Sequence, residues 1–156
     1  MLAAGGPLSA QGADTGYAGL QRRGQMVMGV DQYTSAHQFD LTPDGGRIVL
    51  VRAASDTAGV RKIRDHLQDI ARAFAAGDFG HTMMVHQREL PGVSVMRQRR
   101  SAIRFAVDTL AGGGAVRIST TDPAAVRAIH QFLGAQRMDH HSGGMSDTTR
   151  AGPQHE

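Results

Sequence analysis

The feature that most restricts the fold is an internal repetition of one strand–turn–strand–helix pattern. Residue 39 can be placed over residue 105 and the two stretches continued without gaps. The identical pairs include Phe39 with Phe105, Gly46 with Gly112, Asp56 with Asp122, Val60 with Val126, Ile63 with Ile129 and Leu67 with Leu133. Such self-similarity indicates a duplicated supersecondary unit.

Each unit combines a β-hairpin pattern with a helix pattern. In the first hairpin, residues 37–41 alternate between faces, TPDGG supplies turn residues and RIVLVRA is rich in β-branched residues. In the second, AIRFAVD and AVRISTT flank the turn segment TLAGGG. Asp56 and Asp122 suit the N-cap position, and Pro123 suits the first helical turn. Apolar residues of the first helix recur along one stripe: Val60, Ile63, Leu67, Ile70 and Phe74.

These patterns predict an α+β fold. The duplicated ββα units are expected to form a four-stranded antiparallel sheet with two helices on one face. Residues 37–76 should superpose on residues 103–140. The single domain spans residues 35–141, and residues 78–100 link its two units.

The two ends of the chain lack these patterns. Residues 1–34 are interpreted as a truncated signal-like segment and a flexible arm, and residues 142–156 as a disordered tail. The opening MLAAGGPLSAQGADTG has small apolar residues and A-x-A-like steps but no charged start. We therefore expect export, to the periplasm or the medium.

Composition excludes several kinds of site. The chain has no cysteine, which rules out disulfides, thiolate zinc sites and cysteine nucleophiles. No stretch reaches the roughly 18 apolar residues of a membrane span. The net charge is +3, and all of the Lys and Arg side chains except Lys62 are arginine. The most basic stretch, residues 96–104, carries no aromatic residue, so a solvated helix face is favoured over nucleic-acid binding.

The linker concentrates residues that bind soft metals. A connection of this length within a compact domain must pack, bind something, or both. Imidazole suits both copper states and thioether sulfur suits Cu(I). Methionine is also a common gap-filler in cores poor in aromatic residues, which is the competing interpretation. The candidate ligands of the linker are His81, Met83, Met84, His86 and Met96.

Two further histidines are reserve ligands. His37 shares a strand face with Phe39 and Leu41, where a hydrogen-bonded core histidine is favoured over an inward-pointing ligand. His130 shares a helix face with Leu133. Either side chain can join a metal site only if the fold brings it to the linker.

Signatures of catalysis are absent from the sequence. No serine lies in a G-x-S-x-G elbow, and no pair of carboxylates stands out as an acid and a base. The glycines at 112–114 fall in a hairpin turn and not between a strand and a helix, so they do not form a phosphate-binding loop. The protein is therefore expected to be non-catalytic.

A set of ordered motifs resembles a family of small bacterial proteins. In chain order the motifs are MGVDQ, AH-x-F at the start of a strand, IR-x-HL followed by GDF, VH followed by PGV, and TTD followed by DH. Together they cover residues 28–140. The family is one of exported proteins without an established activity, so the resemblance implies a single exported domain and no particular chemistry.

Two function hypotheses follow. The first is a non-catalytic exported protein that binds a soft or borderline metal ion, copper first, through a His/Met cluster. The second is a protein–protein interaction module that uses an exposed sheet face or edge strand to pair with another chain or a copy of itself. Convergence of the histidines on one point favours the first hypothesis, and their scatter favours the second.

Export yields a direct prediction. If the signal-like segment is cleaved, protein isolated from its native host will begin after about Ala13. Intact-mass measurement of an extracytoplasmic fraction checks this expectation. Recovery of the intact Met1 terminus from a cytoplasmic fraction would contradict it.

Overall fold

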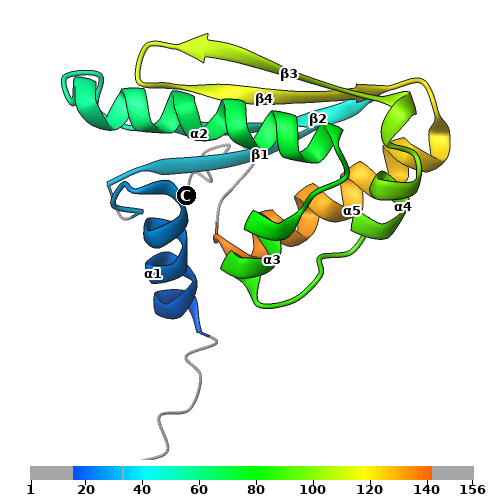
Figure 1. Ribbon diagram of the computed structural model, residues 1–156, viewed down its shortest axis with the longest axis horizontal. Helices are drawn as coiled ribbons and strands as arrows, with labels where there is room; N and C mark the ends of the chain where they lie inside the picture. The colour runs from blue at the N-terminus through cyan, green and yellow to red at the C-terminus, as the bar shows by residue number, and fades with distance from the viewer. Residues whose placement is uncertain (1–15, 33, 142–156) are drawn as a thin grey trace, which may run out of the picture.

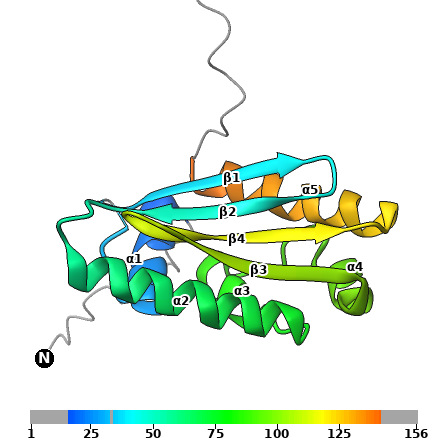
Figure 2. The ribbon, with the colours of Figure 1, turned by 90° about the horizontal axis from the view of Figure 1, so that it is seen from above.

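The computed structural model describes residues 16–32 and 34–141 and confirms the α+β class. Four antiparallel strands form one sheet in the order β1-β2-β4-β3, as Figure 2 shows. Their bounds are Ala36–Thr42 for β1, Gly45–Val51 for β2, Ile103–Leu110 for β3 and Gly113–Thr120 for β4. The predicted antiparallel sheet of two hairpins is therefore present, and β2 and β4 join the hairpins at its centre.

Two long helices carry most of the packing against the sheet. Helix α2 (Thr57–Ala75) packs mainly on β3 and β4, whereas α5 (Pro123–Asp139) packs mainly on β1 and β2. Each hairpin is thus covered by the helix that follows the other hairpin. The predicted N-caps are confirmed, because the carboxylates of Asp56 and Asp122 accept from the backbone N–H groups of Gly59 and Ala124, each at 2.9 Å.

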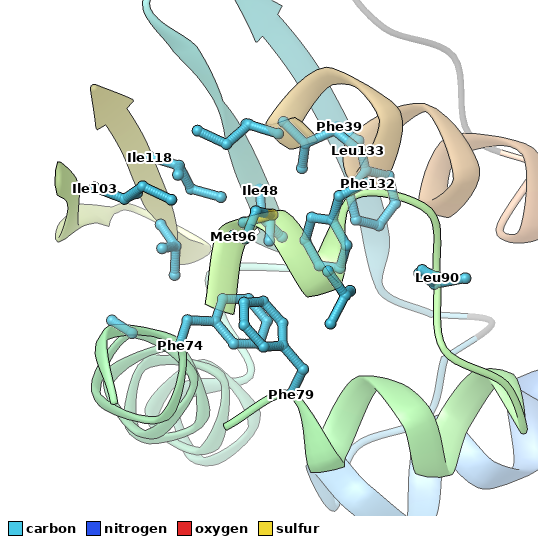
Figure 3. Close-up of a cluster of buried hydrophobic side chains, with 14 of the residues drawn as sticks. Phe39, Ile48, Phe74, Phe79, Leu90, Met96, Ile103, Ile118, Phe132 and Leu133 are labelled. Atoms are coloured by element: carbon cyan, nitrogen blue, oxygen red, sulfur yellow. The ribbon is translucent and has the colours of Figure 1, made fainter. Parts of the chain in front are cut away.

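The core is a single cluster built from both helices, the sheet and the linker (Figure 3). The rings of Phe74 and Phe79 stack at 4.5 Å, and Phe132 meets both edge-on at 5.7 and 5.8 Å. These offset and edge-to-face arrangements are the ones aromatic rings prefer. A chain with only 4% aromatic residues therefore concentrates most of its phenylalanines at one point of the core.

The alignment of the two units needs a correction within the hairpins. When the two hairpins are aligned at their turns, residues 43–44 and 111–112, Phe39 corresponds to Val107 and not to Phe105. Phe39 lies opposite Ile48, and Val107 lies opposite Val116 in the same way. The second unit then reaches its helix through a shorter connection, residues 121–122 against 52–56. A shift of two positions leaves every strand residue on the same face of the sheet. The sequence alignment therefore predicted the correct sheet face for each strand residue, although it matched the wrong residues of the two units.

The N-terminal arm is partly helical. Residues Tyr17–Met28, which the sequence assigned to a flexible arm, form α1. Its buried positions are Gly19, Leu20, Gln21 and Gly24, which include one large apolar residue. An amphipathic stripe is consequently missing, and this is the physical reason why periodicity did not reveal the helix.

The linker is fully organised. It contains α3 (Gly80–His86), α4 (Val93–Gln98) and a 3₁₀ turn (Arg100–Ala102). Figure 1 shows α3 and α4 on the same side of the sheet as α5, and the contacts place α3 against α1 and α4 against α5. The sequence of residues Met96–Ser101 favours a short helix, and α4 overlaps this stretch, whereas no pattern in the sequence predicts α3. The described part of the chain has five α-helices, and the two beyond those that the sequence predicts are α1 and α3.

The signal-like opening and the tail lie outside the described residues, since these exclude 1–15 and 142–156. Among the helices that are described, none combines the length and apolar character needed to cross a membrane.

The two helix stripes give a stability prediction. Leu67 and Leu133 are 1% and 0% exposed, so Leu67→Ala and Leu133→Ala should each lower the free energy of unfolding by about 2–5 kcal/mol. Urea denaturation of the purified variants measures the loss. A loss well below this range at either position would mean that its stripe is not part of the cooperative core.

Candidate functional site

The predicted linker ligands do not face one point. Met83 and Met84 lie on the surface of α3 with 44% and 59% exposure, whereas Met96 is 1% exposed and packs in the phenylalanine core (Figure 3). His81 is exposed, and His86 is buried at the end of α3. The methionines and histidines of the linker are therefore separated by the packing of α3 and α4, and Met96 behaves as a core gap-filler.

Histidines from several elements line one partly open cavity of about 70 Å³. Five of the eight histidines of the chain line it, together with a methionine of α1 and two glutamines. We call this cavity the histidine pocket. Its polar and sulfur-containing residues are Met28, Gln32, His37, His66, His81, Thr82, His86, Gln136 and His140.

The imidazole rings form two groups. His140 lies at the centre of one group, stacked on His37 at a centroid distance of 4.9 Å and edge-on to His86 at 5.2 Å. At the other end, His66 and His81 lie 6.0 Å apart. Residues from β1, α2, α3 and the end of α5 are thereby brought together, so the structure joins His37, His81 and His86 of the predicted set and adds His66 and His140.

Two ring nitrogens of the first group lack partners. Nε2 of His37 and Nδ1 of His140 are buried and have no hydrogen-bond partner among the described residues, and Oε1 of Gln32 is in the same situation. A buried polar atom without a partner destabilises a protein by about 1–3 kcal/mol. These atoms therefore require water, a metal ion or a polar ligand atom in the cavity.

His86 is held firmly by hydrogen bonds. Its side chain is 1% exposed, Nδ1 lies 2.7 Å from Oδ2 of Asp139, and Nε2 lies 3.1 Å from Oε1 of Gln136. Arg88 donates to the same carboxylate at 2.7 and 3.2 Å. This bidentate contact fixes Asp139, which in turn fixes the imidazole.

Burial keeps His37, His66 and His140 neutral at pH 7. It lowers the pKa of His37 to about 4 and that of His66 to about 4, with smaller contributions from neighbouring histidines. Burial also lowers the pKa of His140 to about 3, helped by His37 and His86. At pH 7 these rings therefore carry lone pairs that are available to a metal ion or a hydrogen-bond donor.

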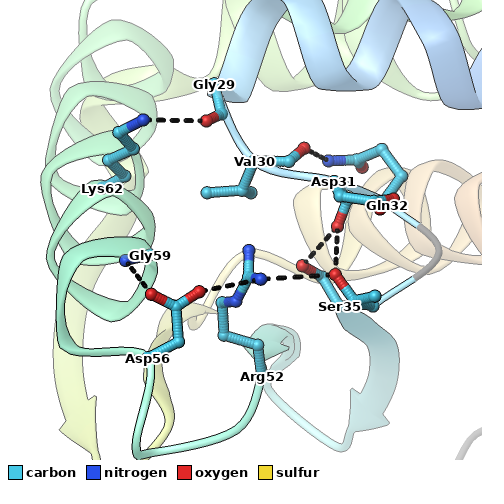
Figure 4. A network of polar contacts seen from close by, with 10 residues as sticks. Gly29, Val30, Asp31, Gln32, Ser35, Arg52, Asp56, Gly59 and Lys62 are labelled. Atoms are coloured by element: carbon cyan, nitrogen blue, oxygen red, sulfur yellow. Dashed lines mark hydrogen bonds and ion pairs between the residues drawn. The ribbon is translucent and has the colours of Figure 1, made fainter.

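The segment that carries Gln32 to the pocket is anchored to α2 (Figure 4). Nζ of Lys62 donates to the carbonyl of Gly29 at 3.3 Å, and Nε2 of Gln32 donates to the carbonyl of Val30 at 2.9 Å. A Cβ at Gly24 would lie 2.9 Å from Oε1 of Gln32, so a larger residue there would push the Gln32 side chain aside.

His130 does not contribute to the pocket. Its Nε2 lies 2.8 Å from the carbonyl oxygen of Thr42, where it ties α5 to the end of β1. The reserve role for His130 is thus replaced by a structural one, whereas His37 does point into the cavity.

Sequence reasoning missed His66, His140 and the pocket role of Met28. In the sequence, His66 lies at the border of the apolar stripe of residues 60–74 and His140 lies near the end of a helix pattern, and neither position predicts a pocket. The available signal was the inward face of β1, since His37 shares it with Phe39. Nothing local to the sequence shows that the end of α5 returns to the start of β1.

The described residues contain no ready-made group of three or more His, Asp or Glu side chains that could hold a metal ion. The pocket thus brings imidazoles near one another without aligning three of them on one point. Any metal site here requires side-chain rotation.

Comparisons with protein-family models, curated proteins and solved structures found no match.

The lowered pKa values predict how stability depends on pH. Because the folded-state pKa values of His37, His66 and His140 lie below the ordinary value of 6.5, the unfolded chain binds protons first as the pH falls. Stability is complete above about pH 6.5 and is lost down to about pH 3–4, by up to ~1.4 kcal/mol per pH unit for each histidine. Urea unfolding of the metal-free protein between about pH 7.5 and 5 measures this slope.

His66→Gln should reduce the slope, because it removes one of the three groups. His130→Gln is the matched control, since His130 lies outside the pocket and is not among the neighbours that lower the pKa values of His37, His66 and His140, so it should leave the slope unchanged. Equal slopes in all three proteins would contradict the burial of neutral histidines.

Proposed function

We propose that the protein is an exported, non-catalytic binder of a transition metal ion, copper first, and that the ion occupies the histidine pocket. The observation that carries the proposal is the pair of buried, unpartnered nitrogens, Nε2 of His37 and Nδ1 of His140, whose rings stack at 4.9 Å. The proposal keeps the predicted chemistry and moves it from the linker to the cavity.

The size of the cavity favours an ion over an organic ligand. A volume of about 70 Å³ is far below the roughly 300–1,000 Å³ of pockets that hold drug-sized molecules. It is sufficient for a metal ion with one or two water molecules. The pocket therefore suits a small occupant, and apolar side chains such as Phe39, Leu50 and Ile70 make up much of its lining.

The donor set favours copper. Neutral imidazoles are the metal-binding form of histidine, and the lowered pKa values of His37 and His140 preserve that form well below pH 7. Met28 lines the same cavity and adds a soft thioether. Imidazole with thioether suits Cu(I) better than the hard, oxygen-seeking cations Mg²⁺ and Ca²⁺.

Binding requires a modest rearrangement. In the metal-free arrangement the rings of His37 and His140 are stacked with an interplanar angle of 17°, and His86 Nε2 is occupied by Gln136. Rotation of one stacked ring and release of Gln136 would turn three imidazoles toward a common ion. Such side-chain rotations are far smaller than a change of fold.

The outer face of the sheet supports an interaction module less well. No helix packs on this face in the described part of the chain, but its charged residues already pair with each other: Arg47 with Asp40 at 2.9 Å and Arg117 with Asp108 at 3.4 Å. Large exposed apolar residues are few, and Leu41 at 44% exposure is the one that a strand contributes within the described residues. A self-pairing face would be expected to carry a contiguous apolar patch.

The proposal predicts tight binding that depends on the pocket. Cu(I) and Cu(II) should bind the wild type with one site, and His37→Gln/His140→Gln should weaken Cu(I) binding by at least tenfold because two ligands are lost. Calorimetry for Cu(II) and a competing chromophoric chelator for Cu(I) measure the affinities. Zn²⁺ tests whether any imidazole-seeking ion is accepted.

Two control proteins test whether the ion binds in the pocket or elsewhere on the chain. His130→Gln removes a histidine that lies outside the pocket, and Met83→Leu/Met84→Leu removes the exposed linker methionines; both should bind copper as the wild type does. Weakening by the methionine pair alone would restore the linker site. Equal, weak binding by every protein would reject metal binding and leave the interaction module.

A further inference from the structure

We infer that Asp139 and Arg88 are positioning residues that hold His86 with its hydrogen on Nδ1, so that the lone pair of Nε2 faces the histidine pocket. The purpose of this arrangement rests on the proposed metal-binding function, whereas the arrangement itself can be tested in the metal-free protein.

The contact between His86 and Asp139 sets which nitrogen is protonated. An ionised carboxylate can only accept hydrogen bonds, and its Oδ2 lies 2.7 Å from Nδ1 of His86. Nδ1 must therefore carry the hydrogen. In a neutral imidazole the lone pair is then on Nε2, the nitrogen that faces Gln136 on the pocket side.

Arg88 keeps that carboxylate ionised and in place. Its guanidinium donates to both oxygens of Asp139, at 2.7 and 3.2 Å. Because Arg88 is about half exposed and Asp139 is 21% exposed, the pair can form at the surface while His86 stays buried.

Gln136 completes the arrangement as a displaceable partner. The two ends of a side-chain amide exchange places by a rotation of 180°, and their assignment follows from the hydrogen-bond pattern. The structure places Oε1 of Gln136 3.1 Å from Nε2 of His86, which would require a hydrogen on Nε2 as well. The inferred lone pair on Nε2 therefore requires the Gln136 amide to be turned by 180°, so that its NH₂ group donates to Nε2. A metal ion that binds Nε2 takes the place of this single hydrogen bond.

This geometry matches the requirement of a histidine ligand. Metal-binding histidines usually donate their other N–H to a carboxylate, which fixes the ring and raises its basicity, and loss of the partner typically costs 10–100-fold in metal affinity. A purely structural role would need His86 only to fill space and to satisfy its two nitrogens. The two roles differ in the tautomer that they require.

The first test needs neither metal nor a variant. Two-dimensional ¹H–¹⁵N correlation of the imidazole nitrogens of metal-free protein near pH 7.5 should show His86 with Nδ1 protonated and Nε2 unprotonated. A doubly protonated ring, or a hydrogen on Nε2 alone, would overturn the inference whether or not the protein binds metal.

The second test removes the charge that fixes the tautomer. In Asp139→Asn, Arg88 retains one acceptor oxygen and the new NH₂ group faces Nδ1 of His86, so the hydrogen should move to Nε2. Cu(I) affinity, measured by chelator competition, should fall by about 10–100-fold. Asp108→Asn is the matched control, because it also breaks an Asp–Arg pair but lies on the outer sheet face.

The outcomes separate the two proposals. Unchanged affinity and an unchanged tautomer in Asp139→Asn, with tight binding by the wild type, would overturn the positioning role and leave the metal site standing. No binding by the wild type, with the expected tautomer in the first test, would reject the metal site and keep the arrangement of His86.

Discussion

The pairing of β2 with β4 at the centre of the sheet is the contact on which both the core and the histidine pocket depend. It joins the two hairpins, with Ile48 opposite Val116, and creates one continuous surface for both long helices. Helix α5 then packs across β1 and β2, and not on its own hairpin. This crossing carries His140, at the end of α5, back to His37 near the start of β1.

Polar contacts fix where α5 lies along β1. Nε of Arg137 donates to the carbonyl of Phe39 at 3.1 Å, and Nε2 of His130 contacts the carbonyl of Thr42 at 2.8 Å. Both contacts use backbone acceptors of an edge strand that would otherwise face water or another chain. The same contacts therefore protect a sheet edge and set the distance between His37 and His140.

Local signals in the sequence predicted the helices and strands of the two hairpin units well, but they could not predict which distant residues meet in the fold. Asp56, Asp122 and Pro123 act within one helical turn, and Leu67 and Leu133 follow a helical period, so each could be interpreted from its neighbours. The strand faces were also correct, because a two-residue error preserves the side of the sheet.

By contrast, α1 buries mostly small residues, and the meeting of His37 with His140 depends on the crossing of α5. The His/Met content of the linker suggested a metal site there, but packing directs Met96 to the core and leaves Met83 and Met84 on the surface.

The unpartnered nitrogens of His37 and His140 are the observation on which the proposed metal site rests. Each buried atom without a partner costs about 1–3 kcal/mol, and an apolar side chain of similar shape would remove that cost. The chain does fill the adjacent core in this way, with Met96 and Phe79 at 1% and 3% exposure. If the proposed ion binds there, its coordination by both nitrogens would remove this cost. Binding would also stabilise the fold by mass action, by about 2.7 kcal/mol when the free ion concentration is a hundred times the Kd. Under the same proposal, the contact of Arg88 and Asp139 with His86 would orient one ligand before the ion arrives.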